Sequence, residues 1–271
     1  PRSVYDPRMG MRTVPWSPDR DVVADFLRMG EHKHMMHGFL EVDVTELAAR
    51  QRARADAGLE RLSTTGVLAC ALGRAMAQHP EVHAYRVGDR LVLFDESDVS
   101  LIVETQVRGQ PVVVPHVFRD LHVRSAEEVH VQLRAIQRGG MPKRRRRLVD
   151  LFPRLPGPVR RAALRAMLAA PERLKAWAGT AGLSSVGMFG RGVAGFALPH
   201  PTIHSLGVTV GSLLEKPRFV GGRVMPRQLL SLTLSLDHDV VDGAPATRFA
   251  RTFAARLESA EDVPLPGRLG R

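Results

Sequence analysis

Residues 231–249, "SLTLSLDHDVVDGAPATRF", constrain the fold of this chain more than any other stretch. Leucines alternate with Ser and Thr over 231–236, which is the period of a strand with one buried face. Pro245 suits a first helical turn, and apolar residues then recur at helical spacing: Ala246, Phe249, Ala250, Phe253, Ala254 and Leu257. His238 is therefore predicted to follow a strand end, a position from which rigid scaffolds often present functional groups.

The residues around His238 leave four interpretations open when they are taken alone. Asp237, Asp239 and Asp242 could join the imidazole in a metal site, although they fall at a strand end and not on one helix face. His238 could equally be a structural histidine with satisfied hydrogen bonds. It could be a general base at the mouth of a sheet, or a pH switch.

The composition describes an ordinary globular chain that is expected to be cytoplasmic. With 271 residues and 44% hydrophobic content, it can bury one sizeable core, or two smaller ones, without disulfides or a structural metal. Cys70 is the only cysteine, which excludes an internal disulfide. No apolar run approaches the roughly 18 residues of a membrane span, and residues 1–20 lack the apolar core of a secretory signal.

The net charge of +11 is concentrated in residues 143–175, which carry eleven basic and two acidic side chains, a net charge of +9. This segment is also apolar, and we predict short helices with an apolar stripe beside arginines: Leu148, Leu151, Phe152 and Leu155 beside Arg144–Arg147, and Val159, Ala163, Leu164 and Met167 beside Arg160, Arg161 and Arg165. Such helices can lie on an anionic membrane or cover a lipid-like substrate. Packing against the core would use the same stripe. Nucleic acid is not an expected partner, because interleaved aromatic residues and a groove-reading motif are missing.

The remaining pattern predicts an α/β sandwich with a mixed sheet, because strands and helices alternate without a regular βαβ repeat. Strands are predicted at 37–44, in a hairpin at 84–94 turning at Gly88–Asp89, at 99–118 with a break near Gly109, at 203–214 and at 231–236. Helices are predicted at 45–57, from 63 to before Pro80, and after a capping box of Ser125 and Glu128. We expect a single domain over 1–271 with a basic, Pro-punctuated helical insertion at about 141–178.

Two motifs in register resemble the catalytic domain of the 2-oxoacid dehydrogenase acyltransferases (E2). "LSLTLSLDHDVVDGAPATRFARTF" is similar to that family's HxxxDG signature, and "GTAGLSSVGMFG", at 179–190, is similar to its GTFTISNLG stretch. Ser184 then falls 54 residues before His238. Weaker similarity in the order of elements extends the resemblance over most of residues 14–258.

The resemblance implies a chloramphenicol acetyltransferase-like two-layer sandwich, with a mixed β-sheet flanked by helices, and transfer of an acyl group from a CoA or related pantetheine thioester. It makes His238 the general base and Ser184 the oxyanion donor, and it gives Asp242 a loop-organising ion pair. Other candidates for shaping the loop or the substrate site are Gly243, Ser185, Thr180 and Asp239. It also implies a homotrimer with active sites between subunits, acyl-CoA as substrate, and no tightly bound cofactor or metal.

Three departures from the family pattern leave a catalytically silent trimeric scaffold as the alternative. Asp239 stands where the family usually has Arg, and a nearby carboxylate would favour the protonated form of His238. Gly182 replaces a family Thr, and the basic insertion is longer than the family's connection. Lipoyl-lysine and subunit-binding segments are not found in the chain, so the resemblance is to a free-standing catalytic core.

Two further groups of residues are expected to be structural. His32, His34 and His37 lie together, but no fourth metal ligand is evident near them. Cys70 lies among apolar helical neighbours and is expected to be a small core residue.

Overall fold

A computed structural model describes residues 4–6, 10–107, 110–138, 147, 150–185 and 193–266. Its strands are β1 (Val4–Asp6), β2 (Met11–Thr13), β3 (Met35–Asp43), β4 (Tyr85–Val87), β5 (Arg90–Val92), β6 (Val99–Val107), β7 (Gln110–Phe118), β8 (Ala181–Ser185), β9 (Leu206–Val220) and β10 (Arg223–Asp237). Its helices are α1 (Pro18–Gly30), α2 (Thr45–Asp56), α3 (Thr64–Gln78), α4 (Ala126–Gln137), α6 (Gly157–Leu168), α7 (Pro171–Ala178) and α8 (Gly243–Ser259). Short 3-10 turns span Pro80–His83 and Phe152–Arg154.

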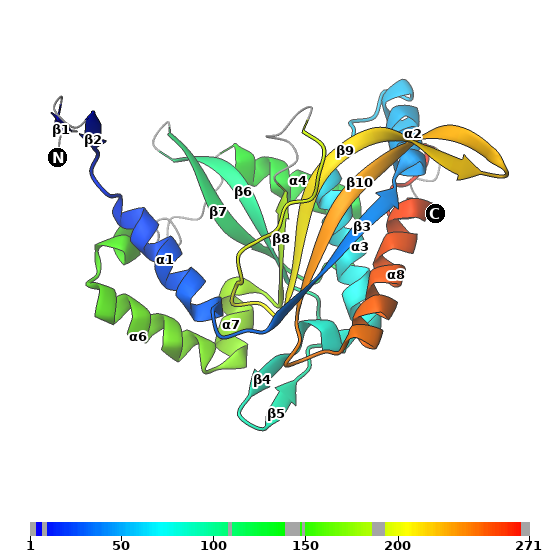
Figure 1. The fold of residues 1–271 in the computed structure, drawn as a ribbon. Coiled ribbons are helices and arrows are strands. Elements are labelled where there is room, and N and C mark those ends of the chain that lie inside the picture. Colours follow the sequence, from blue (N-terminus) through cyan, green and yellow to red (C-terminus); the bar gives the residue numbers. More distant parts are fainter. Residues whose placement is uncertain are drawn as a thin grey trace.

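Six of the strands form one mixed sheet in the order β3-β10-β9-β8-β6-β7 (Figure 1). β8 is parallel to both β6 and β9, and the other neighbours are antiparallel. The ends of β10 and β7 and the beginnings of β3, β9, β8 and β6 therefore share one edge of the sheet. We call this the His238 edge, because His238 directly follows β10.

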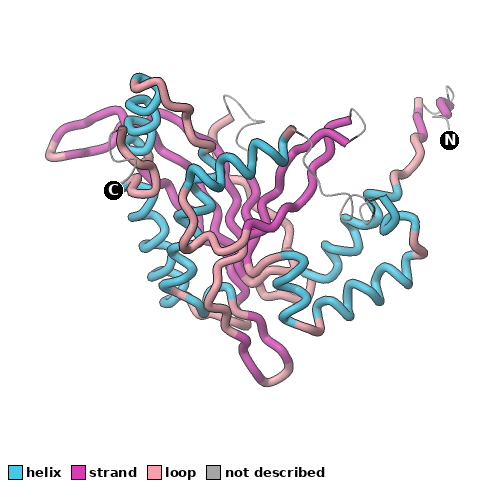
Figure 2. The backbone as a smooth tube through the Cα atoms, turned by 180° about the vertical axis from the view of Figure 1, so that it is seen from behind, coloured by secondary structure: helices cyan, strands magenta, loops and turns pink. Residues whose placement is uncertain are grey.

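The main core lies between one face of the sheet and helices α2, α3, α4 and α8, which Figure 2 shows covering that face. The leucines of β10 face this core as predicted: Leu230, Leu232, Leu234 and Leu236. The prediction of a single buried face is wrong, because Ser231, Thr233 and Ser235 on the other face are buried too. Phe249, Phe253 and Leu257 of α8 pack on the same core. These two elements therefore fix the main-chain positions on both sides of His238.

Helices α1 and α6 pack together to one side of the sheet, and α7 connects them to its edge beside β7 (Figure 1). A small cluster of Tyr85, Leu174 and Ile203 joins this group to the rest, with Met167 packed against it. Arg160 of α6 is buried and its Nε donates to Asp25 Oδ2 of α1 at 2.9 Å. Leu164 is buried on the same face of the helix. At Arg160 and Leu164 the stripe is therefore used for packing, which is the structural alternative that the sequence left open for this segment.

Local sequence signals are confirmed in most elements. Ser125 and Glu128 form the predicted capping box of α4, and Ser63 accepts a bond from the main chain of α3. The hairpin turns at Gly88–Asp89 as predicted. Two elements differ. Residues 18–30 form helix α1, which was not predicted, and β9 and β10 continue past the predicted 203–214 and 231–236 as a two-stranded ribbon to a turn at Gly221–Gly222.

None of the helices within the described ranges combines the length and apolar character needed to span a membrane. In that same part of the chain, no group of three or more His, Cys, Asp or Glu side chains is arranged to hold a metal ion. Cys70 is fully buried in α3, and burial raises the pKa of its thiol to about 12. The thiol is therefore protonated at neutral pH and packs as a small apolar group.

Candidate active site

His238 is the first residue beyond β10, and its imidazole is 52% exposed. The main chain holds it on both sides, since His238 N donates to His34 O at 2.8 Å and Asp237 N donates to Ser205 O at 2.9 Å. Its ring thus lies at the surface on a main chain anchored to two neighbouring strands. A base in this position can reach a bound acceptor while its own location stays fixed.

Asp237 organises the turn that carries His238. Its Oδ1 accepts the main-chain N–H of Asp239 at 3.2 Å, and its carbonyl accepts those of Val240 and Val241 at 3.0 and 3.1 Å. Its Oδ2 lies 2.5 Å from Nζ of Lys33, the residue two positions before β3. The Asp237 side chain is 5% exposed, so this ion pair is largely removed from water.

Asp239 does not approach the catalytic candidate as the sequence suggested it might. Its Oδ1 lies 3.0 Å from Nδ1 of His34, on the lead-in to β3. Asp239 therefore faces the neighbouring strand, and the departure from the family's Arg does not place its carboxylate against His238. Sequence alone could not show this, because His34 and Asp239 are 205 residues apart.

Asp242 is highly exposed and, within the described part of the chain, does not form the loop-organising ion pair that the resemblance implied. Its side chain is 86% exposed, and its Oδ1 lies 3.8 Å from Nδ1 of His238. Among the described residues, no Lys or Arg lies within ion-pair distance of it. Gly243, which follows it, begins α8, and a Cβ at that position would meet no heavy atom within 4 Å.

Ser184 and Ser185 lie at the end of β8, far from His238 in the same chain. Ser184 is opposite Thr209 of β9, and Thr209 is opposite Thr233 of β10, five residues before His238. Strand spacings put the two side chains roughly 10 Å apart across the sheet and roughly 17 Å apart along it, or about 19 Å in all. One chain therefore cannot bring Ser184 and His238 to a single carbonyl group.

Gly182 and Thr180 lie at the start of β8, on the His238 edge. A Cβ at Gly182 would lie 3.2 Å from Nδ1 of His204, so the space that a family Thr would need is occupied by this ring. Burial lowers the pKa of His204 to about 4, and its Nε2 donates to Ala178 O at 2.9 Å. Thr180 is buried, with its Oγ1 donating to Asp98 O at 3.2 Å. It thus fastens the beginning of β8 to that of β6.

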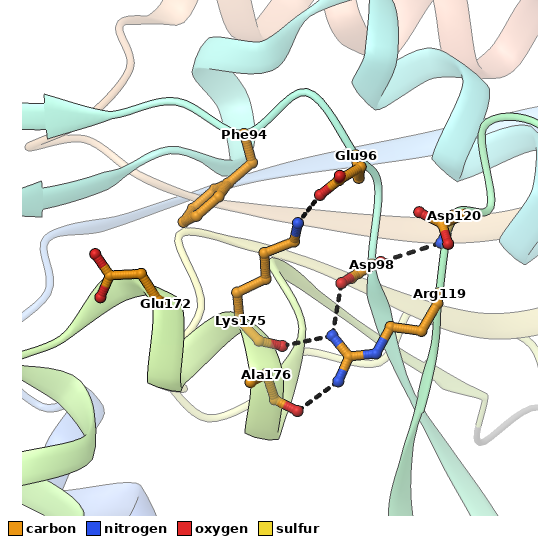
Figure 3. Close-up of a pocket in the computed structure, with 8 residues that line it drawn as sticks. All are labelled: Phe94, Glu96, Asp98, Arg119, Asp120, Glu172, Lys175 and Ala176. Carbon is orange, nitrogen blue, oxygen red and sulfur yellow. Dashed lines mark hydrogen bonds and ion pairs between the residues drawn. The ribbon is translucent and has the colours of Figure 1, made fainter.

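A cavity of about 520 Å³ opens farther along the same edge (Figure 3). It is lined by Phe94, Glu96, Asp98, Arg119, Asp120, Glu172, Lys175 and Ala176. Arg119 pairs with the buried Asp98 at 2.6 Å and Lys175 pairs with Glu96, so both cationic groups already have acidic partners. His238 does not line this cavity. We therefore assign the candidate active site to the exposed turn at His238.

Comparison with known proteins supports the resemblance found in the sequence. Residues 162–265 match the family model of the 2-oxoacid dehydrogenases acyltransferase (catalytic domain). The chain is 25% identical over 265 residues, 96% of its length and 50% of the relative's, to the dihydrolipoyllysine-residue succinyltransferase component of 2-oxoglutarate dehydrogenase complex 1, mitochondrial, of Arabidopsis thaliana. It is 28% identical over 261 residues, 93% and 47% of the two chains, to the dihydrolipoyllysine-residue acetyltransferase component of the mitochondrial pyruvate dehydrogenase complex of Schizosaccharomyces pombe.

A solved structure confirms the predicted fold class. The cubic core of the pyruvate dehydrogenase multienzyme complex superimposes with a TM-score of 0.69 and 20% identity, covering 97% of this chain and 98% of that one. The fold is thus that of the acyltransferase cores. The chain spans about half the length of the two curated relatives.

Proposed function

Because residues 162–265 match the catalytic domain of the 2-oxoacid dehydrogenase acyltransferases, we propose that this chain transfers an acyl group from a CoA or related pantetheine thioester to a thiol, hydroxyl or amine. The observation that carries the proposal is the half-exposed His238, fixed at a strand end by main-chain bonds to two neighbouring strands. An imidazole held in this way can accept a proton from an incoming nucleophile.

In the proposed reaction, His238 removes the proton of the acceptor as the acceptor attacks the thioester carbonyl. The new bond forms at the carbonyl carbon, and negative charge develops on its oxygen. When the carbonyl re-forms, the CoA thiolate leaves and takes up the proton held by His238. No group of the enzyme is acylated, and His238 returns to its starting state.

The developing negative charge needs a donor, and we assign this role to Ser184 of a second copy. Within one chain the two residues are about 19 Å apart by strand geometry, which supports an active site assembled between subunits. A hydroxyl placed at the developing oxyanion is worth a large part of catalysis in acyl transfer. The cubic core with the same fold belongs to a multimeric assembly, which favours a homotrimer or a trimer-based assembly here.

The acceptor is proposed from the names of the relatives and from the exposure of the turn. Both curated relatives are named for acyl transfer involving a dihydrolipoyllysine residue, so a dithiol is the first acceptor to test. The turn at His238 and the open space at Gly243 leave room for a flexible acceptor. CoA is a substrate in this proposal and not a resident cofactor.

A second, smaller proposal concerns the basic segment, residues 143–175. We propose that the protein is cytoplasmic and that this segment contacts an anionic membrane or a lipid-like substrate. Arg154, Arg165 and Arg173 are exposed, as are Leu151 and Val159, so charge and apolar surface occur together on this part of the molecule. Arg144–Arg146 and Leu148 lie outside the described residues.

Thioester turnover tests the main proposal. We expect CoA release from one or more acyl-CoAs that depends on an added acceptor, measured over a panel of acyl chain lengths and of dithiol, alcohol and amine acceptors. If no acyl-CoA is consumed and CoA does not raise the melting temperature, the chain is a silent scaffold and the acyltransferase proposal is wrong.

A further inference from the structure

We infer that Lys33 and Asp237 form a buried ion pair that positions His238, and that this pair replaces the loop-organising role that the family assigns to the aspartate of its HxxxDG motif. The expected changes in kcat and KM rest on the proposed function, whereas the expected change in the position of His238 rests on the structure alone. Lys33 and Asp237 are thus positioning residues in this inference, since their side chains contact each other and the main chain of the turn that carries His238.

Lys33 and His34 hold the chain at His238 and at the residue before it. Lys33 Nζ is 2.5 Å from Asp237 Oδ2, and in the next position the carbonyl of His34 accepts the main-chain N–H of His238 at 2.8 Å. Lys33 and His34, just before β3, therefore contact Asp237, the last residue of β10, and His238, which follows it. These contacts follow from the antiparallel register of β3 and β10, in which Met35 is opposite Asp237.

The carboxylate of Asp237 links Lys33 to the turn that follows β10. One carboxylate oxygen faces Lys33, and the other accepts the main-chain N–H of Asp239. A carboxylate that bridges a fixed cation and a main-chain donor holds both the direction of the side chain and the path of the turn. If the cation is removed, the carboxylate is left buried without its charge partner, and the turn loses one of its two anchors.

The burial of the pair is the reason to assign it more than a stabilising role. The Lys33 side chain is 19% exposed and that of Asp237 is 5% exposed. A buried ion pair is often no more stabilising than apolar residues of similar size, whereas it fixes a geometry that apolar packing does not. The pair also lies directly beside the one histidine that the proposed chemistry requires.

A matched control exists in the same molecule. Arg74 of α3 and Asp262 form an ion pair of similar length, 2.6 Å, and similar burial, with side chains 24% and 4% exposed. Asp262 follows the carboxyl end of α8, whereas His238 precedes its amino end, and a helix of 17 residues is about 25 Å long. Arg74→Met therefore removes a buried cation from a pair of similar length at a distance from His238, with Arg256 Nη2 still 3.2 Å from Asp262 Oδ1.

The experiment compares Lys33→Met, Asp237→Asn, Lys33→Arg and Arg74→Met in the full chain by two measurements. The first is the NMR resonance of the His238 Cε1–H group, assigned by its loss in His238→Ala. The second is kcat and KM for the acyl-CoA that the wild-type protein turns over. The resonance does not depend on turnover, so it tests the positioning role even if the wild-type protein proves inactive.

We expect Lys33→Met and Asp237→Asn to move or broaden the His238 resonance and to lower kcat at least about tenfold, since small displacements of a reacting group are costly. KM for acyl-CoA should change less than about twofold, because the pair does not bind CoA in this proposal. Lys33→Arg should restore both measurements, and Arg74→Met should change neither.

An unchanged His238 resonance and an unchanged kcat in folded Lys33→Met would overturn the inference. If Lys33→Met does not fold, the same comparison applies to the double variant Lys33→Met with Asp237→Leu, in which no charge is left buried. A folded double variant with a native resonance and native kcat would equally overturn it. A changed resonance in an inactive wild-type background would support positioning while refuting the acyltransferase proposal.

Discussion

Ser184 lies at the end of β8, and His238 follows β10 two strands away at the opposite edge of the sheet, so that strand geometry puts them about 19 Å apart. We therefore expect that mixing His238→Ala with Ser184→Ala restores activity, because a site between chains can combine one intact residue from each variant. With random mixing in a closed ring, about a quarter of the sites are complete. Turnover after co-refolding the two inactive variants measures this recovery.

The contrary outcome is well defined. If co-refolded mixtures show only the summed activities of the two variants while wild-type protein refolded in the same way regains its full rate, the two residues do not share a site between chains. A double variant carrying both substitutions, mixed with wild type, controls for simple dilution.

The general-base assignment predicts a large kinetic effect at His238 with little effect on folding. His238→Ala should lower kcat by roughly 100-fold or more, since a positioned proton acceptor contributes about 10² to 10⁴. The ring is half exposed, so its removal leaves no cavity in the core. Steady-state CoA release and thermal unfolding measure the two effects. Near-wild-type turnover in the folded variant would remove His238 from the mechanism.

The oxyanion assignment predicts a different kinetic pattern at Ser184. Ser184→Ala should reduce kcat by roughly 10² to 10³, because the hydroxyl acts on charge that develops in the transition state. The affinity for acyl-CoA should change little. A loss confined to KM would instead show that Ser184 contacts the ground state, and the proposed role would be wrong.

Two buried histidines predict that stability falls in mild acid. Burial lowers the pKa of His83 and of His204 to about 4 from an ordinary value of 6.5. The unfolded chain therefore binds more protons between these values, so each neutral ring contributes stability that is fully present above pH 6.5 and is lost as the pH falls toward 4. The loss is roughly 3 kcal/mol per histidine.

Urea unfolding at pH 7.5 and pH 5 tests this sign. The difference in unfolding free energy between the two pH values should shrink in His204→Gln and in His83→Gln, and shrink further in the double variant. A difference that is the same in wild type and in the double variant would assign the acid sensitivity to other groups.

The basic segment predicts salt-sensitive binding to anionic vesicles. Each basic residue near an anionic surface contributes about 1 kcal/mol, and salt screens the attraction. We expect vesicle sedimentation to show binding to anionic but not neutral lipid, weakened by salt and by replacing Arg144–Arg147 or the exposed Arg154, Arg165 and Arg173 with Gln. The matched control replaces three exposed arginines elsewhere: Arg52, Arg248 and Arg251.

Two results would limit the role of this segment. Equal binding to both kinds of vesicle, or binding to neither, would leave residues 143–175 as a structural cover or a contact for the phosphates of CoA. An equal loss of binding in the control variant would show that net charge, and not this segment, is responsible.

Much of this protein was determined by short-range pattern in the sequence. The alternation over 231–236 predicted the strand before His238, the box of Ser125 and Glu128 predicted the start of α4, and Gly88–Asp89 predicted a hairpin turn. Each of these signals is contained in a few neighbouring residues, because its physical cause acts locally: alternation of apolar side chains, capping of a helix end, or positive φ in a turn.

Only the tertiary structure decided which groups meet. It paired Lys33 with Asp237 and His34 with Asp239 across strands β3 and β10, and it buried Arg160 against Asp25. It also separated Ser184 from His238 within one chain, although the resemblance of two motifs assigned both residues to one active site. These contacts depend on the order and register of the strands, which the pattern of charge and hydrophobicity along the chain does not specify. Residues about 200 positions apart in the sequence, such as Lys33 and Asp237, meet only when the sheet and its core assemble.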